Sequence, residues 1–412
     1  MRASLIVMMI WCAQPVAAQS LNTSEPDSPV ERIEMKAIGT EQGFADWLAG
    51  FRHRATDADI PAPLLDRALA QARFNEKIVE RDRNQNEFTK TIWEYLDTAV
   101  SDDRVALGIK AMARHAPLLA RIEAEYGVDR HIVAAIWGLE SAYGTFRGDI
   151  PTIEALATLA YDARRAAFFE EQLIAALKII ANGDVTARAM RGSWAGAMGH
   201  TQFMPTSWWS FAVDFTGDGK RDIWSDDPAD ALASTAAYLR HWGWTTGARW
   251  GLEVMLPDGF DYDQTTERVK KPVADWAAIG IKPVGGGGLP DHGLASILLP
   301  GGARGAAFLI FSNFQVLERY NTADAYVIAV GHLADRLRGG PTIAAAWPRE
   351  LRALSLEERM ELQDRLGQAG FDPKGVDGRI GPNTIAAIKG FQKANGLVPD
   401  GYASLEILTL LR

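Results

Sequence analysis

The sequence of 412 residues contains a single cysteine, Cys12, which lies close to its amino terminus. One cysteine cannot form an intrachain disulfide, and the remaining residues offer neither a thiol nucleophile nor a cysteine-ligated metal. Positive charge is scarce as well, because 43 Lys and Arg face 52 Asp and Glu, which gives a formal net charge of −9. This balance gives no support to binding of nucleic acid or of an anionic membrane.

Long apolar runs are also missing. The run from Leu5 to Ala13 is too short to form a stable membrane span. It follows one arginine and precedes the small residues Ala17 and Ala18, an order that predicts a secretory signal peptide over residues 1–18. Bulky Trp11 directly before Cys12 argues against lipid attachment at that cysteine. We therefore expect a soluble protein that is exported to the bacterial periplasm.

The apolar periodicity of the chain predicts a mainly α (α+β) protein in several parts. Residues 19–40 are rich in Ser, Pro, Glu and Asp and predict a disordered lead-in. Residues 41–338 are mostly of helical period, residues 339–354 are rich in Pro, Gly and Ala and predict a linker, and residues 355–412 predict a small module of three helices. Helices are expected at Pro63–Ala72, Ile153–Ala160, Phe168–Asn182, Ala229–Trp242 and Phe314–Leu337.

A change of character between residues 250 and 310 predicts a small insertion that contains strands. Short apolar runs at Leu252–Leu256, Ile297–Pro300 and Ala307–Ile310 are separated by Gly-rich turns such as Gly285–Gly288. The expected architecture is therefore a helical domain with a strand-containing insertion, followed by the three-helix module.

Glu140 is the residue most suggestive of chemistry. It stands near the end of a predicted helix with Asp129 as the N-cap, and it shares a face with Val133 and Ile136. Burial among apolar side chains raises the pKa of a carboxyl, as a general acid near neutral pH requires. The alternative is a glutamate at a frayed helix end that simply reaches water.

A second motif surrounds Gln202, in the run from Trp194 to Pro205. Its two glycines among small residues let a backbone pass close to a ligand. Gln202 and the preceding Ser193 could then form hydrogen bonds with sugar amides and hydroxyls. The alternative is a tight loop between helices without a ligand.

A third motif is the acidic, glycine-rich run from Asp214 to Asp222. Oxygen-bearing side chains at its positions 1, 3 and 5, Gly at position 6 and a carbonyl at position 7 match the first half of an EF-hand calcium loop. Ser225 stands where the bidentate Glu of such a loop is expected, and Asp230 could supply the late carboxylate by a longer path. An Asp/Gly-rich turn without a metal is the alternative.

Two further motifs follow towards the carboxyl terminus. Tyr320-Asn321 and Tyr326 place an amide between two phenols, which suits recognition of sugar hydroxyls and N-acetyl groups but fits a core and a helix cap equally well. In the last module, a turn over Asp377–Gly381 leads into a helix that begins with Pro382.

The order of these motifs resembles the lytic murein transglycosylase B family (glycoside hydrolase family 103), over nearly all of residues 40–338. Residues 355–412 resemble the three-helix peptidoglycan-binding domain often attached to such enzymes. The resemblance implies a lysozyme-like catalytic domain at 41–338, with peptidoglycan glycan strands as the binding partner. It also implies that Glu140 is the catalytic acid. The residues that match cleft positions are Ser193, Gln202, Tyr238, Tyr320, Asn321, Tyr326 and, less closely, Tyr95.

The family's calcium site maps onto the third motif. Its ligands would be Asp214, Thr216, Asp218, the Lys220 carbonyl and Asp230, although two extra residues precede Asp230. We expect no cofactor for catalysis, and a structural calcium ion is the one metal that the resemblance implies.

The motif segments offer only one candidate acid, whereas ordinary glycosidases use two carboxylates. One acid suffices if the substrate supplies its own nucleophiles. We therefore expect cleavage of the MurNAc-β-1,4-GlcNAc bond without water, which leaves 1,6-anhydro-MurNAc ends. In this reaction Glu140 acts first as acid and then as base. Two alternatives stay open: a lysozyme-like muramidase that hydrolyses the same bond, and a non-catalytic cell-wall-binding protein. The sequence does not identify protein partners.

Overall fold

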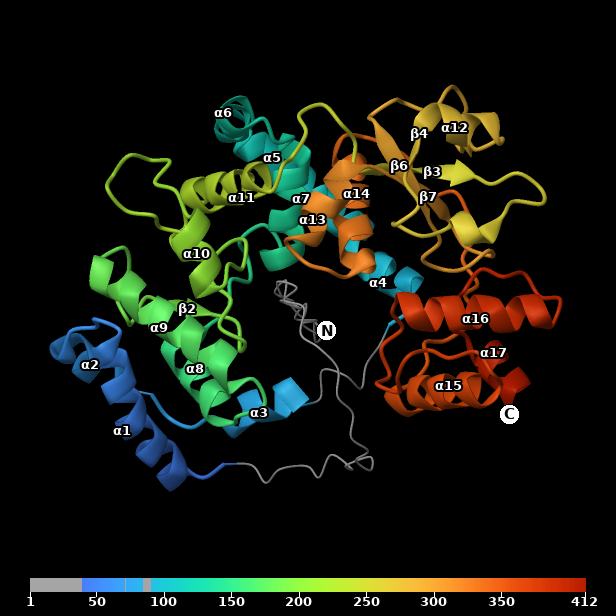
Figure 1. The fold of residues 1–412 in the computed structure, drawn as a ribbon. Helices are drawn as coiled ribbons and strands as arrows, with labels where there is room; N and C mark the ends of the chain where they lie inside the picture. Colours follow the sequence, from blue (N-terminus) through green and yellow to red (C-terminus); the bar gives the residue numbers. More distant parts are fainter. Residues whose placement is uncertain (1–38, 71, 84–89) are drawn as a thin grey trace.

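A computed structural model describes residues 39–70, 72–83 and 90–412. The expected signal peptide, and the expected lead-in apart from Gly39 and Thr40, lie outside the described residues. The described chain forms a body of helices at one end, a small sheet at the other, and a three-helix module beside the sheet (Figure 1). Within these described ranges, no helix combines the length and the apolar character needed to cross a bilayer.

Helices build the part of the chain that precedes residue 250, as its apolar periodicity predicts. In chain order they are α1 (Glu41–Asp57), α2 (Ala62–Leu69), α3 (Glu76–Arg83), α4 (Ile92–Ala99), α5 (Asp102–Arg114), α6 (Ala116–Tyr126), α7 (Arg130–Ser141), α8 (Thr152–Tyr161), α9 (Ala166–Asn182), α10 (Pro205–Phe211) and α11 (Ala229–His241). Two short strands, β1 (Ile150–Pro151) and β2 (Arg191–Gly192), pair antiparallel between these helices. The helices expected at 63–72, 153–160, 168–182 and 229–242 are confirmed as α2, α8, α9 and α11, with ends that differ by at most three residues.

Helix α7 lies at the centre of the helical body. Its N-cap is Asp129, whose side chain accepts from the amide of His131. It ends at Ala142, whose φ of 48° turns the chain into the left-handed region. Between these ends α7 packs against α5, α6, α11 and α14. The helix is buried nearly all round, since Val133, Ile136 and their neighbours expose almost nothing to solvent.

A five-stranded antiparallel sheet forms the insertion, in the order β4-β6-β7-β3-β5. Its strands are β3 (Gly251–Met255), β4 (Lys271–Pro272), β5 (Lys282–Pro283), β6 (Leu294–Leu298) and β7 (Ala307–Ile310), with the short α12 (Val273–Ala278) beside them. The sheet has its own apolar core around Trp276 and Phe311. The strand expected at Ile297–Pro300 begins three residues earlier, because Leu294 and Ala295 pair with β4, and it ends at Leu298.

The single helix expected over Phe314–Leu337 is wrong. The chain forms α13 (Ser312–Glu318) and α14 (Asp324–Leu337), with a break between them at residues 319–323. The side-chain carbonyl of Asn321 accepts from the amide of Ala323 at 3.0 Å. Such a bond to the nearby backbone competes with helical pairing, which is why asparagine favours turns and caps.

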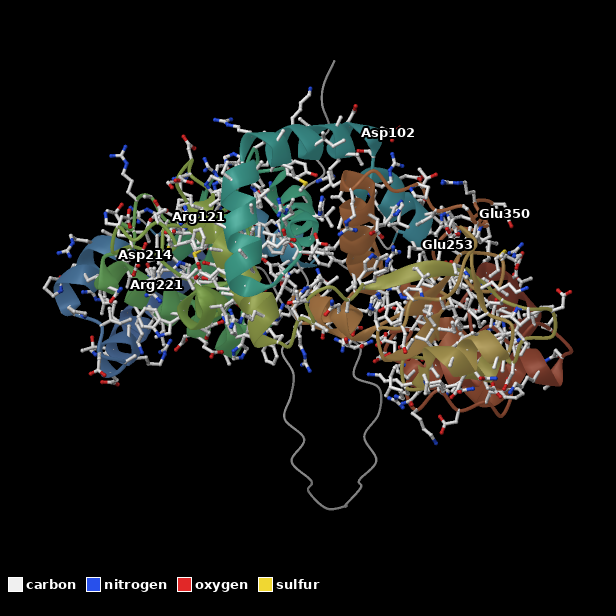
Figure 2. All side chains as sticks on the ribbon, turned by 90° about the horizontal axis from the view of Figure 1, so that it is seen from above. Asp102, Arg121, Asp214, Arg221, Glu253 and Glu350 are labelled. Carbon is white, nitrogen blue, oxygen red and sulfur yellow. The ribbon has the colours of Figure 1, made fainter. Side chains whose placement is uncertain are left out.

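The last module contains α15 (Leu356–Gln368), α16 (Pro382–Ala394) and α17 (Leu405–Leu411) around a separate core. Residues 339–354, which precede it, form neither helix nor strand, yet they pack on the body. Trp347 contacts Trp93 with ring centroids 6.1 Å apart, and the Glu253 carboxylate accepts the amides of Ala344 and Ala345 at 2.8 and 2.7 Å. Figure 2 shows Glu253 and Glu350 at the end of the molecule opposite to Asp214 and Arg221.

The module is also joined directly to the sheet. The Lys389 side chain is 8% exposed, and its ammonium donates to the Tyr262 carbonyl at 2.6 Å and to the Thr265 hydroxyl at 2.9 Å. An ion pair between Lys393 and Asp263 lies beside it. A buried ammonium needs such partners, because a charge removed from water without them costs free energy. These contacts therefore hold α16 against the insertion.

Candidate active site

Glu140 lies in the last turn of α7 and is only partly accessible to solvent. Burial raises the pKa of its carboxyl from 4.5 to about 7, and a hydrogen bond from Tyr326 opposes part of that rise. No other carboxylate among the described residues contributes to this pKa. The alternative of a frayed helix end that reaches water does not fit, because Glu140 is half-buried and accepts a hydrogen bond from Tyr326.

Tyr326 is the direct partner of Glu140. It lies on α14, and its hydroxyl donates to Glu140 Oε1 at 2.6 Å. Because the phenol supplies the proton of this bond, the proton of a neutral Glu140 resides on Oε2. The bond thus fixes the orientation of the carboxyl and leaves one oxygen to exchange a proton with a ligand.

Three more tyrosines predicted for the cleft gather near Glu140. Tyr320 and Tyr95 have pKa values raised first by burial and second by the charge of Glu140. The Tyr238 ring meets Tyr320 edge to face, with centroids 5.2 Å apart. The Tyr320 hydroxyl donates to the Thr201 carbonyl at 2.6 Å, and the Tyr238 hydroxyl donates to the Arg319 carbonyl. With their protons used in this way, these hydroxyls can only accept hydrogen bonds from a ligand.

The residues that follow Glu140 attach α7 to the loop of the second motif. The Ser141 hydroxyl donates to the His200 carbonyl at 2.5 Å and accepts the Gly144 amide at 3.0 Å. The Trp137 indole donates to His200 Nδ1 at 3.1 Å. Burial is the main cause that lowers the pKa of His200, so its ring is neutral near pH 7. These contacts hold the end of α7, and with it Glu140, against the loop.

The loop itself is closed by its own polar groups. Ser193 Oγ accepts the Ala197 amide at 3.1 Å. The Gln202 side chain is 8% exposed, and its amide nitrogen donates to the Arg147 and Gly199 carbonyls at 3.0 and 2.8 Å. The Gln202 carbonyl oxygen is therefore the part of this amide that remains for a ligand. A Cβ on Gly199 would lie 2.3 Å from the Ile223 carbonyl, which explains the need for glycine at this close approach.

Asn321 lies next to Tyr320 in the break between α13 and α14. Its side chain is 5% exposed, and its carbonyl oxygen binds the chain that begins α14. The structure thus brings Glu140, Tyr326, Tyr320, Tyr238 and Tyr95 together. Asn321 and Ser193 bind the backbone of their own loops.

The acidic loop has a different design. Asp214 accepts the amides of Gly217 and Gly219 at 2.7 and 2.8 Å, and the buried Asp230 accepts those of Phe215 and Asp222, each at 2.9 Å. Desolvation raises the pKa of Asp214, but the hydrogen bonds from these amides together outweigh it, so the pKa lies below its ordinary value.

The donor set of this loop suits calcium in kind. Carboxylates, a Thr hydroxyl and a carbonyl are the oxygen ligands that the ion takes in proteins. Each of Asp218 Oδ1 and the Asp230 oxygens accepts at least one backbone amide, so the loop also closes without an ion.

One acidic cluster was not foreseen from the sequence. Among the described residues, Glu267, Glu318 and Asp324 are the carboxylates that bring three oxygens within 4.8 Å of one another. Burial first, and the charge of Glu267 second, raise the pKa of Glu318 to about 8 and that of Asp324 to about 6. The three residues come from separate elements, and no spacing along the chain announces their meeting.

Fold and site together define a class: a lysozyme-like, mainly helical enzyme with one buried acid among tyrosines. Residues 43–335 match the model of the transglycosylase SLT domain, and residues 355–411 match that of a putative peptidoglycan-binding domain. The chain therefore belongs to the SLT transglycosylase family, and it is a lytic murein transglycosylase.

Known relatives support this membership. The chain is similar to SltB3 of Pseudomonas aeruginosa, solved in complex with NAG-NAM-pentapeptide, at 48% identity and a TM-score of 0.88 over 90% of this chain and 100% of that one. It is also similar to the membrane-bound lytic murein transglycosylase B of Escherichia coli, with 32% identity over 287 residues. These residues cover 65% of this chain and 76% of that protein. The E. coli lytic transglycosylase Slt35, solved in complex with calcium, is 29% identical with a TM-score of 0.61 over 71% of this chain and 92% of that one.

Proposed function

We propose that Glu140 serves as both acid and base in cleavage of the MurNAc-β-1,4-GlcNAc bond of peptidoglycan. The observation that carries this assignment is the hydrogen bond from Tyr326 to Glu140 Oε1 at 2.6 Å, in surroundings that raise the pKa of Glu140 to about 7. A carboxyl with a pKa near the working pH can donate a proton in one step and accept one in the next.

The reaction proceeds in two steps. Neutral Glu140 gives its Oε2 proton to the glycosidic oxygen, while the 2-acetamido group of the muramyl residue attacks the anomeric carbon as the C–O bond breaks. The ionised carboxylate then takes the proton of the C6 hydroxyl, whose oxygen attacks the anomeric carbon and displaces the acetamido oxygen. This closes the 1,6-anhydro ring and returns the proton to Glu140, so no water is consumed.

The tyrosines around Glu140 form the proposed substrate cleft. Tyr95, Tyr238 and Tyr320 offer their rings, Tyr238 and Tyr320 also offer accepting hydroxyls, and Gln202 offers its carbonyl oxygen. Aromatic rings and hydroxyls of this kind fit the alternating apolar faces and donor groups of N-acetylated sugars. Ser193 and Asn321 complete the cleft by holding their loops in place.

The chain divides, in this proposal, into a signal peptide at 1–18, a lead-in at 19–40, the catalytic domain at 41–338, a linker at 339–354 and the wall-binding module at 355–412. Action on peptidoglycan implies that the enzyme works in the periplasm. The module adds a second contact with the same polymer, which raises the effective concentration of substrate at the cleft.

We further propose that the acidic loop binds a structural calcium ion through Asp214, Thr216, Asp218, the Lys220 carbonyl and Asp230. The oxygen chemistry of these groups supports this, as does the calcium complex of the relative Slt35. The ion would brace the loop and takes no part in proton transfer.

Mass spectrometry of the products formed from purified sacculi tests the reaction. The proposal expects 1,6-anhydro ends, about 18 Da lighter than the reducing ends that a hydrolase leaves, since they lack one water. Reducing ends as the main product would instead establish a muramidase, and binding to sacculi without any release of muropeptides would establish a wall-binding protein.

A further inference from the structure

A row of aromatic rings continues from the proposed cleft to the surface at the end of α11. The Tyr320 ring lies 5.2 Å from that of Tyr238, and the Tyr238 ring lies 6.3 Å from that of Trp242, measured between centroids. Phe211, the last residue of α10, contacts both Tyr238 and Trp242, at 4.8 and 6.4 Å. Burial first, and the charge of Glu140 second, raise the pKa of Tyr320. The row therefore starts beside the proposed acid and ends at Trp242.

Trp242 differs from the other tryptophan that the described surface exposes. Trp209 is 45% exposed and Trp242 is 37% exposed. Single exposed apolar side chains are common on protein surfaces and need no function, and Trp209, whose one ring contact among the described residues is with Trp208, fits that description. Trp242 is instead the exposed end of a cluster that leads to a catalytic acid. A ligand that extends out of the cleft along these rings would meet its indole.

The indole of Trp242 is held in place by its neighbours. Its backbone amide donates to the Tyr238 carbonyl at 3.2 Å. The guanidinium of Arg319 lies over the indole, 5.0 Å from a ring centroid, and the Arg319 carbonyl accepts the Tyr238 hydroxyl. Apart from this contact and the nearby charge of Glu318, the Arg319 guanidinium has no partner among the described residues. Its N–H groups therefore remain for a ligand beside a fixed aromatic ring.

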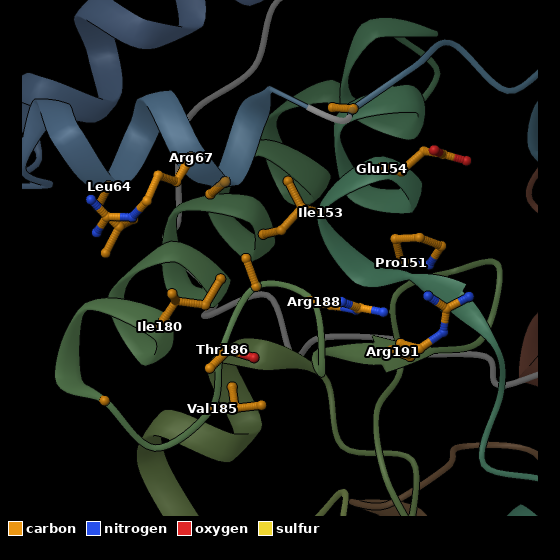
Figure 3. A pocket seen from close by; sticks show the side chains of 14 residues that line it. Leu64, Arg67, Pro151, Ile153, Glu154, Ile180, Val185, Thr186, Arg188 and Arg191 are labelled. Carbon is orange, nitrogen blue, oxygen red and sulfur yellow. The ribbon is translucent and has the colours of Figure 1, made fainter.

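A cavity elsewhere in the helical body shows by contrast what this surface offers. It has a volume of about 650 Å³ and lies between α2, α8 and the end of α9 (Figure 3). The described residues of its wall include Leu64, Arg67, Ile153 and Thr186, and none of them is aromatic. The face of a sugar ring is flat and apolar, and an aromatic ring is the side chain that matches it best. The surface at Trp242 therefore suits a sugar better than this cavity does.

We propose that Trp242 and Arg319 form an outer subsite for the glycan strand, where a sugar ring stacks on the indole and its oxygens accept hydrogen bonds from the guanidinium. The inference rests on the proposed function, because a strand reaches this subsite while its cleavable bond lies beside Glu140. Only a strand long enough to extend past Tyr238 meets Trp242, so the subsite makes affinity depend on strand length. Because the contact lies away from the reacting atoms, it contributes to KM and leaves kcat unchanged.

Steady-state kinetics of the full chain test the inference on synthetic glycan strands of two to five disaccharide repeats that all carry the same peptides. For the parent, KM should fall about fivefold at the length that first reaches Trp242, as expected for one additional stacked ring. Trp242→Ala should lose this fall, and Trp242→Phe should keep part of it. The kcat of both variants should stay within about twofold of the parent on every strand.

Two further variants complete the test. Trp209→Ala removes the other exposed tryptophan and should keep the full dependence on length, and Arg319→Gln, which leaves the indole in place, should weaken it about twofold. Thermal melting verifies that each variant is folded.

A parent without dependence on length, or a dependence that survives in Trp242→Ala, overturns the subsite. An equal rise in KM on all strands would also overturn it, because Trp242 would then act only by packing on Tyr238. In each of these cases 1,6-anhydro products leave the proposed function intact. Reducing ends formed by the parent would count against the proposed function itself.

Discussion

The site around Glu140 and the loop around Asp214 both contain carboxylates, yet their surroundings shift the pKa values in opposite directions. Glu140 receives one hydrogen bond, from a phenol, and burial raises its pKa to about 7. Asp214 receives several backbone amides, and its pKa falls. The balance between burial, which raises the pKa, and hydrogen-bond donors, which lower it, therefore differs between the two carboxyls.

Asp230 shows that donors and burial act independently. It is 2% exposed, and burial raises its pKa despite the amides of Asp222, Thr216 and Phe215, which act downward. Unlike Glu140, it has its oxygens occupied by those amides and none directed at a cleft. A raised pKa alone therefore does not identify a catalytic acid. A carboxyl oxygen that is left for a ligand, as Oε2 of Glu140 is, indicates such an acid more specifically.

The largest expected effect comes from removing the carboxyl that we propose as the acid and base. Glu140→Gln should lower turnover of sacculi by about 10³-fold or more, because one group supplies both the acid and the base step. Release of muropeptides measured by chromatography gives the rate. Glu171→Gln, on an exposed glutamate of the same domain, should keep the parent rate. Turnover of Glu140→Gln within tenfold of the parent would remove Glu140 from the mechanism.

The same variant should become more stable than the parent at high pH. The folded-state pKa of about 7 exceeds the ordinary value of 4.5, so ionising Glu140 costs folding free energy that is absent below pH 4.5 and complete above pH 7. Glu140→Gln should therefore gain on the order of 2–3 kcal/mol at pH 8 and nearly nothing at pH 4. Denaturant unfolding at both values measures this. An equal gain at the two values would show that Glu140 does not titrate with a raised pKa.

Tyr326→Phe should widen the difference in pKa between Glu140 and Asp214. Losing the phenol removes the group that favours the charged form, so the pKa of Glu140 should rise and kcat should fall about tenfold. The alkaline limb of the pH–rate profile, where Glu140 loses its proton, should move to higher pH.

Tyr143→Phe is the matched control for this variant. The Tyr143 hydroxyl is buried without a hydrogen-bond partner among the described residues, so its loss should leave the profile in place. If both variants moved the limb equally, the effect would not come from the bond between Tyr326 and Glu140.

The smallest expected effect concerns calcium at the acidic loop. With free calcium about fivefold above its Kd, binding should stabilise the fold by about 1 kcal/mol, seen as a rise in Tm. Asp214→Asn should abolish that rise, whereas Asp258→Asn, outside the loop, should keep it. An unchanged Tm of the parent at millimolar calcium would make the loop a metal-free turn.

Much of the fold could be predicted because its signals are local. The strands β3 and β7 stand as short apolar runs between turns, and most helices follow their apolar period. The break between α13 and α14 was missed, because one asparagine that turns its side chain to the backbone outweighs a continuous apolar period.

The sequence by itself determined the class of chemistry: one candidate acid on an apolar face, no thiol besides Cys12, and motifs of a known family in their order. Only the tertiary structure decided the surroundings of that acid. Tyr326 lies 186 residues further along the chain from Glu140, and the burial that raises the pKa comes from several elements packed together. Desolvation and hydrogen bonding act through space, so no local pattern could have predicted a pKa near 7 or an Oε2 free to exchange its proton.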